Sequence, residues 1–196
     1  MLIQQCINAG VQVALFSVVP LFWWLVTARK KQRFTEWIGM KKPEGGKMLL
    51  GWTAMVFFVC LLAGEVALRV RGDVPVAESA YAGMGFGALP SVCVYAYIQT
   101  ALSEEILFRG FLFKRLMAKM GFVAANVIQA AIFGALHLLM VWGHVGLVAG
   151  AVIVLYPMIP AVAFAVLNER KAGGSIWPGW FIHGTLNAVS ACFALF

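Results

Sequence analysis

Residues 145–167 read VGLVAGAVIVLYPMIPAVAFAVL and contain no charged side chain. A helix needs an apolar run of about 20 residues to cross the hydrocarbon core of a bilayer. The whole chain has this character, because hydrophobic residues make up 62% of its 196 residues and charged residues only 12%. Soluble domains contain about 45–50% hydrophobic residues and about 25% charged residues. The composition excludes a soluble globular domain, a disordered chain and a coiled coil, and predicts an integral membrane protein.

The same criterion of length and hydropathy predicts six membrane-spanning helices, and therefore an all-α, polytopic transmembrane helical bundle. Their expected ranges are 7–27, 48–68, 86–108, 122–142, 145–167 and 175–196. In the third span, Pro90 is expected to introduce a kink. That helix is also expected to continue past Arg109 as an amphipathic extension to about Lys119, and to end at Gly121.

The basic residues give a net charge of +7 and predict how the helices are oriented. The first, third and fifth connections hold 13 of the 15 Lys and Arg residues, and only Arg69 and Arg71 lie in another connection. The positive-inside rule assigns the larger group to the cytoplasm and both termini to the outer face. Arg69 is expected to pair with Glu65 near that face. Because topology accounts for the charge, we expect the lipid bilayer and no nucleic acid as a partner.

A few ionisable and amide side chains lie in or beside the predicted spans, where a charge costs about 2.5–3.5 kcal/mol at the bilayer centre. They include Glu104, Glu105, Arg109, Asn126, Gln129, His137, His183 and Asn187. Costly residues of this kind indicate a functional site. Asn126 and Gln129 are the exceptions, because for them we expect hydrogen bonds between helices.

Counting from the helix ends predicts that three of these side chains lie at one depth. Glu104 lies 17 residues before Gly121 and His137 lies 16 residues after it, so two antiparallel helices would bring them level. His183 lies 9 residues after Gly174, on a helix that starts from the same side. At 1.5 Å per residue, Glu104 and His183 lie roughly 15 Å and roughly 13 Å into a core about 30 Å thick. We therefore expect Glu104, His137 and His183 to converge near mid-membrane.

Helical periodicity gives the polar residues different surroundings. Glu105 and Arg109 share a helix face at i,i+4, where an ion pair lowers the cost of burial. Glu104 is rotated by about 100° from Glu105 and is expected to be unpaired. His183 and Asn187 also share a face. A desolvated carboxylate can take a proton from water, and imidazole and amide N–H groups can stabilise an oxyanion, so this set suffices for amide hydrolysis.

Three short motifs in chain order resemble a known family. Residues 104–109 read EEILFR and match EExxxR, residues 133–137 read FGALH and match FxxxH, and residues 183–187 read HGTLN and match HxxxN. Together they resemble the CPBP family of intramembrane proteases, which includes the CAAX prenyl endopeptidases and the bacterial Abi proteins of bacteriocin processing and self-immunity. The resemblance covers about residues 89–190. We expect two N-terminal spans with a basic loop (1–85) and a CPBP/Abi-like catalytic membrane core (86–196).

The resemblance implies four catalytic residues. Glu104 is the expected general base, and His137 is expected to help activate the water. His183 and Asn187 are the expected donors to the oxyanion and the substrate carbonyl. The family also implies cleavage of a peptide bond in a chamber open to the cytoplasmic side, near a hydrophobic or lipidated C-terminal segment of a peptide or protein substrate.

The resemblance also implies residues that support the site. Glu105 and Arg109 resemble the supporting ion pair of the family, and Phe133 is expected to pack as a wall of the chamber. This chain is shorter than the eukaryotic and archaeal prenyl proteases, which have more spans. Its size and the lack of a eukaryotic targeting signal favour the plasma membrane of a prokaryote.

Several alternatives stay open at the level of sequence. Glu104, His137 and His183 could bind a catalytic zinc ion with an open position, although no HExxH motif is present, and we favour water activation without a cofactor. The same Glu and His residues could instead serve a proton-linked carrier, or the chain could be a non-catalytic immunity or scaffold protein. Among substrates, prenylated CAAX tails compete with peptide precursors such as bacteriocins or pheromones and with C-terminal sorting tails, and the last two are favoured.

Overall fold

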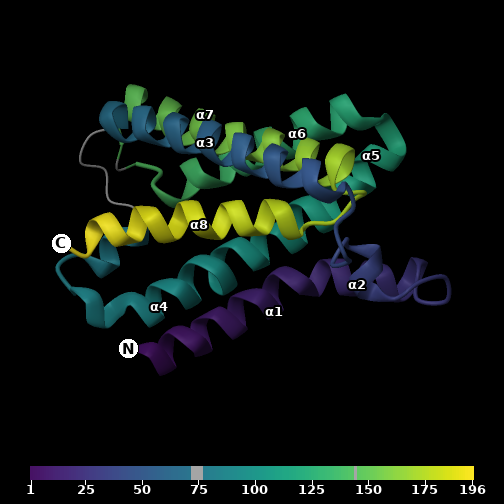
Figure 1. Ribbon diagram of the computed structural model, residues 1–196, viewed down its shortest axis with the longest axis horizontal. Helices are drawn as coiled ribbons and strands as arrows, with labels where there is room; N and C mark the ends of the chain where they lie inside the picture. Colours follow the sequence, from purple (N-terminus) through teal and green to yellow (C-terminus); the bar gives the residue numbers. More distant parts are fainter. Residues whose placement is uncertain (72–76, 144) are drawn as a thin grey trace.

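The computed structural model of the protein describes residues 1–71, 77–143 and 145–196 as a bundle of helices, with no strand among them (Figure 1). The N-terminal part contains α1 (Leu2–Thr27), α2 (Phe34–Trp37), α3 (Gly46–Arg71) and the short turns η1 (Ala77–Tyr81) and η2 (Phe86–Ala88). It is followed by α4 (Leu89–Cys93), η3 (Val94–Leu102), η4 (Glu105–Phe113), α5 (Lys114–Met120) and α6 (Phe122–Met140). The chain ends with α7 (Leu147–Val166), η5 (Leu167–Lys171) and α8 (Trp177–Ala194).

The predicted all-α transmembrane bundle is confirmed. Within the described residues, four helices are long and apolar enough to cross a membrane: Leu2–Thr27, Gly46–Val70, Phe122–Met140 and Leu147–Lys171. The other two predicted spans, 86–108 and 175–196, are also largely helical, and they carry the predicted glutamates and His183. The number of six crossings stays a prediction.

The segments α4, η3, η4 and α5 form one long helix that carries both predicted glutamates. It ends at Gly121, which has a φ of +80°, so the expected extension beyond Arg109 is confirmed. The expected kink at Pro90 is wrong, because Pro90 lies in the first turn of α4. There the missing N–H of proline has no helical partner to lose, and its fixed φ suits the start of a helix. In η3 and η4 the turns are widened to the π type.

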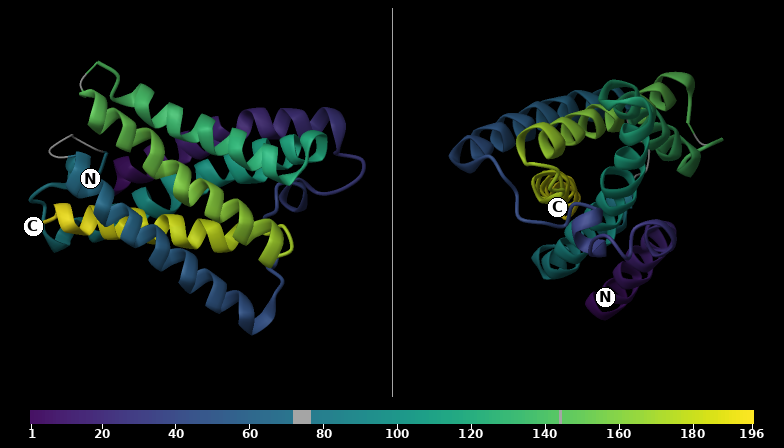
Figure 2. Two further views of the ribbon diagram at one scale, coloured as in Figure 1. Left: turned by 90° about the horizontal axis from the view of Figure 1, so that it is seen from above. Right: turned by 90° about the vertical axis from the view of Figure 1, so that its right-hand side faces the viewer.

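Helix α8 lies at the centre of the bundle (Figures 1 and 2). It contacts α4 and η3 on one side and α3 and α7 on the other. Helix α6 packs along α7, and α1 packs against η3 and η4. Both termini lie at one end of the bundle, and α2 and α5 lie at the opposite end, which we call the basic end.

The loop between α1 and α3 packs against the turn before α8 at the basic end. Ile176 donates its backbone N–H to the carbonyl of Gly39 at 2.9 Å, and the Ser175 hydroxyl donates to the carbonyl of Lys41 at 2.7 Å. Nearby, Lys114 pairs with Glu169. Burial lowers the pKa of Lys114, and the neighbouring Glu169 carboxylate opposes this effect.

Two smaller expectations about polar pairs are confirmed. Arg69 binds Glu65 at 2.7 Å, with both side chains largely exposed. The amides of α6 hydrogen-bond to carbonyls of α7, since Gln129 donates to Ala161 at 3.0 Å and Asn126 donates to Val162 at 3.3 Å. These bonds hold α6 and α7 in register.

Gly134 permits the close packing of α6 on α7. A Cβ atom at this position would overlap the carbonyl oxygen of Val154 and lie 2.9 Å from the Met158 side chain. We predict that Gly134→Ala lowers the free energy of unfolding by about 1–3 kcal/mol, because the backbone of α7 must move. Thermal unfolding of the purified protein in detergent would measure the loss.

Gly51→Ala on α3 is the matched control, because nothing lies within 4 Å of its added Cβ. Alanine favours a helix by about 0.5–1 kcal/mol over glycine, so this variant should unfold at an equal or higher temperature. Equal stability of the two variants would contradict the tight packing inferred at Gly134.

Candidate active site

The Glu105–Arg109 pair forms the buried base of the site. Arg109 Nη1 lies 3.2 Å from Glu105 Oε1, and the two side chains are 1% and 0% exposed. The guanidinium lies over the ring of Phe133, 4.5 Å from its centroid, and 5.5 Å from the centroid of Phe164. Two aromatic faces and one carboxylate therefore lie against the buried cation, and its three guanidinium nitrogens form no hydrogen bond within the described part of the chain. The ion pair expected from the i,i+4 spacing is present.

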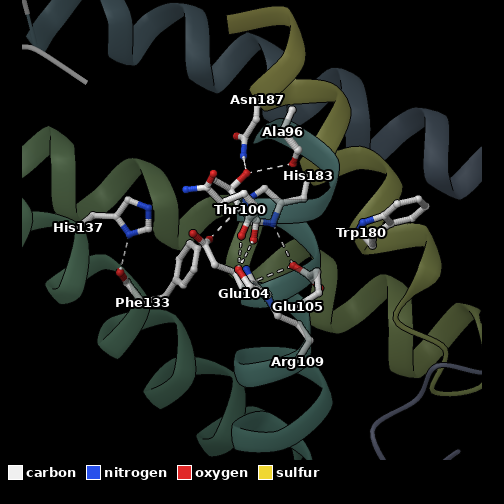
Figure 3. Close-up of polar contacts among 12 residues, drawn as sticks. Ala96, Thr100, Glu104, Glu105, Arg109, Phe133, His137, Trp180, His183 and Asn187 are labelled. Atoms are coloured by element: carbon white, nitrogen blue, oxygen red, sulfur yellow. Dashed lines mark hydrogen bonds and ion pairs between the residues drawn. The ribbon is translucent and has the colours of Figure 1, made fainter. Parts of the chain in front are cut away.

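His183 lies between the two glutamates. Its Nε2 is 3.5 Å from Glu104 Oε2 and its Nδ1 is 3.2 Å from Glu105 Oε1 (Figure 3). The side chains of His183 and Glu104 are 12% and 18% exposed, so the contact is largely but not completely buried. Glu104, which was expected to be unpaired, thus lies within ion-pair distance of His183, while its Oε2 accepts no hydrogen bond from the described residues.

Widened turns flank the two consecutive glutamates that meet one imidazole. In an ideal α-helix, successive side chains are about 100° apart, which separates the directions of Glu104 and Glu105. Glu104 lies at the junction of η3 and η4, both of which have π-type turns. A π turn holds more residues, so successive side chains diverge less. Periodicity read from the sequence assumes regular turns and could not detect this.

Side chains bind several backbone carbonyls of the widened helix. The Thr100 hydroxyl donates to the carbonyls of Tyr95 and Ala96, each at 3.0 Å. The Ser103 hydroxyl donates to the carbonyl of Thr100 at 3.0 Å, and the Trp180 indole donates to the carbonyl of Tyr97 at 2.7 Å. These bonds satisfy groups that a membrane interior leaves without water.

His137 does not contact Glu104 or His183 in the structure. Its Nδ1 lies 2.8 Å from the Phe133 carbonyl oxygen on its own helix. The Phe133 ring lies beside both imidazoles, with centroids 4.6 Å from that of His137 and 6.4 Å from that of His183. The expected convergence therefore brings Glu104 and His183 together and leaves His137 to one side (Figure 3). Residue counting gives the depth of a side chain but not its direction.

The three residues considered as ligands in the alternative zinc mechanism are not grouped together. Among the described residues, no three His, Cys, Asp or Glu side chains are grouped closely enough to hold a metal ion. His137 is the missing third ligand, because its Nδ1 faces a backbone carbonyl and Phe133 lies beside its ring. The residues as they lie do not fit a three-ligand zinc site.

Asn187 lies one turn after His183 on α8, as their spacing requires. Its Nδ2 donates to the Thr100 hydroxyl at 2.8 Å. Thr100 lies one turn before Glu104 on the long helix, so this bond joins the two helices of the site. Sequence reasoning missed Thr100, although its i,i+4 relation to Glu104 places it on the same helix face.

Gly179 allows α8 to approach the long helix at this level. A Cβ at Gly179 would lie 3.1 Å from Glu105 Oε2 and closer still to the Asn168 side chain. Asn168 is buried and accepts the backbone N–H of Gly179 at 3.0 Å. Sequence reasoning also missed Asn168, because its place beside three basic and acidic residues resembles a solvated helix end.

Comparison with known proteins identifies one family. The family model described as type II CAAX prenyl endopeptidase Rce1-like matches residues 86–189, which is more than half of the chain. The matched range includes all of the site residues predicted from the three motifs. No curated protein and no solved structure matched the chain.

The buried and the exposed Glu–Arg pairs provide a matched test of the base of the site. We predict that Arg109→Met lowers the free energy of unfolding by about 3–5 kcal/mol, because Glu105 would stay buried without its cation. Arg69→Met removes the partner of Glu65 in a pair that is 77% and 55% exposed, and this change should cost at most about 1 kcal/mol. Unfolding temperatures of both variants in the same detergent measure the difference, and equal losses would contradict the inferred role of Arg109.

Proposed function

The chain belongs to the Rce1-like family of type II CAAX prenyl endopeptidases, and from this premise we propose that its buried site hydrolyses a peptide bond with water activated by Glu104. The position of His183 supports the proposal best. Its two ring nitrogens face the carboxylates of Glu104 and Glu105 at 3.5 Å and 3.2 Å. The carboxylate of Glu104, the imidazole of His183 and the Glu105–Arg109 ion pair thus lie in one largely buried cluster.

In the proposed reaction, Glu104 accepts a proton from water while the water oxygen attacks the scissile carbonyl carbon. Negative charge moves to the carbonyl oxygen, where His183 Nε2–H and an Asn187 Nδ2–H donate. When Glu104 takes up the proton, its hold on His183 weakens, and the imidazole N–H becomes available to the oxyanion. Glu104 then returns the proton to the amide nitrogen as the C–N bond breaks. One water is consumed, and a carboxyl and an amine are released.

We propose that His137 holds the attacking water from beside Phe133. A carbonyl oxygen only accepts, so His137 Nδ1 is the donor in its 2.8 Å contact with the Phe133 carbonyl. In the neutral imidazole, Nε2 is then an acceptor that can receive a hydrogen bond from water. The backbone contact fixes the tautomer that this role needs.

We propose that the reaction needs no metal, and that Glu104→Gln slows it strongly. Removing the general base should lower kcat by about 10²–10⁴-fold, measured on a fluorogenic prenylated peptide with the protein in lipid vesicles. Activity of the wild-type protein should survive a strong chelator.

Glu65→Gln serves as the control, because Glu65 is exposed and pairs with Arg69 away from the site. It should keep wild-type activity. Loss of activity in chelator with recovery on added zinc would replace metal-free activation by a metal mechanism. Full activity of Glu104→Gln would exclude Glu104 as the base.

We propose a substrate whose C-terminal segment is hydrophobic or lipidated, in agreement with a site set among apolar helices. Three peptides with one cleavage region test this: one farnesylated, one with an apolar tail and one with a polar tail. Binding energy from the tail should make the first two react at least about tenfold faster than the third. Cleavage of the farnesylated peptide alone would identify prenylated CAAX chains, and equal cleavage of the polar peptide would contradict the proposal.

A further inference from the structure

Thr100 is the contact through which the long helix touches the amide of Asn187. It lies in η3, and its hydroxyl is 2.8 Å from Asn187 Nδ2 on α8 (Figure 3). Glu104 follows Thr100 by one helical turn. The group that would stabilise the oxyanion is therefore bonded to the helix that carries the group that would activate water, one turn away from it.

The Thr100 hydroxyl can only accept from Asn187. Its single proton is directed at the carbonyls of Tyr95 and Ala96, each 3.0 Å from Oγ1. A hydroxyl has one proton and two lone pairs. Because the carbonyls use the proton, the hydroxyl can only accept a hydrogen bond from α8. If the amide of Asn187 turned by 180°, its oxygen would face an oxygen that has no proton to share. The Thr100 hydroxyl thus fixes which end of the amide is the donor.

The fixed amide leaves one N–H for a ligand. The NH₂ group of asparagine has two protons, and Thr100 uses one of them. We infer that Thr100 is a positioning residue that orients the Asn187 amide so that its second N–H meets the developing oxyanion. This inference rests on the proposed function of the site, but the orientation of the amide can be tested without activity.

Four variants separate positioning from general support of the helix. Thr100→Val and Thr100→Ala remove the hydroxyl, and Thr100→Ser keeps it. Ser103→Ala is the matched control, because Ser103 also donates to carbonyls of this helix and has no contact with Asn187. We expect Thr100→Val to lower kcat by about 10–100-fold with KM changed by less than about twofold. Thr100→Ser and Ser103→Ala should stay within about threefold of wild type.

Combination with Asn187→Ala tests whether Thr100 acts through the amide. Loss of an oxyanion donor should itself lower kcat by about 10²–10³-fold. In that background Thr100→Val should cause no further loss, because the group it orients is gone. Losses that multiply, or a loss in Ser103→Ala as large as in Thr100→Val, would overturn the inference.

Nuclear magnetic resonance of the Asn187 side-chain amide gives a readout independent of catalysis. With ¹⁵N-labelled asparagine, the signal absent from Asn187→Ala is that of residue 187. The proton bonded to Thr100 should lie downfield of its position in free asparagine in the wild type and in Thr100→Ser, and it should move back toward that position in Thr100→Val and Thr100→Ala. An unchanged signal in a hydroxyl-free variant would refute the inference, whereas failure of every peptide to be cleaved would refute only the proposed function.

Discussion

The buried ion pair between Glu105 and Arg109 is the interaction on which the site depends. Neither charge can be left alone inside an apolar bundle, so each must find partners on other helices. Arg109 contacts the ring of Phe133 on α6 and that of Phe164 on α7, and Glu105 contacts His183 on α8. One pair on the long helix therefore fixes the positions of three neighbours. The motif EExxxR orders the site by joining these helices, in addition to any part in chemistry.

The widened turns of the long helix are a second structural feature of the site. They flank Glu104, which faces the same imidazole as the adjacent Glu105. Inside a membrane, backbone carbonyls have no water to bind. Thr100, Ser103 and Trp180 bind carbonyls of this segment, so the irregular geometry is satisfied by side chains within the bundle. The π turns therefore lie at the predicted catalytic site, as is common for such turns.

The sequence predicts the elements of this fold better than the directions of its side chains. Apolar run length identified the helices, and Gly121 marked the end of the longest one, since a φ of +80° favours glycine. The i,i+4 rule found the Glu105–Arg109 pair. Counting residues placed His137 at the depth of the glutamates, but its ring is turned to its own helix. Thr100 could not be singled out, because a lone hydroxyl in an apolar helix usually bonds only to its own backbone.

The charges of the cluster explain why this chemistry is compatible with an apolar surrounding. Arg109 pairs with the carboxylate of Glu105, and the imidazole of His183 lies between the carboxylates of Glu105 and Glu104. In the proposed reaction, Glu104 takes a proton from water and the hydroxide becomes part of the oxyanion, so one negative charge moves by a short distance and the net charge of the cluster is unchanged. A low-dielectric site penalises net charge far more than the displacement of a charge among fixed partners. The proposed mechanism therefore requires the whole Glu–Glu–Arg–His cluster, because a lone glutamate in an apolar surrounding would lack these fixed partners.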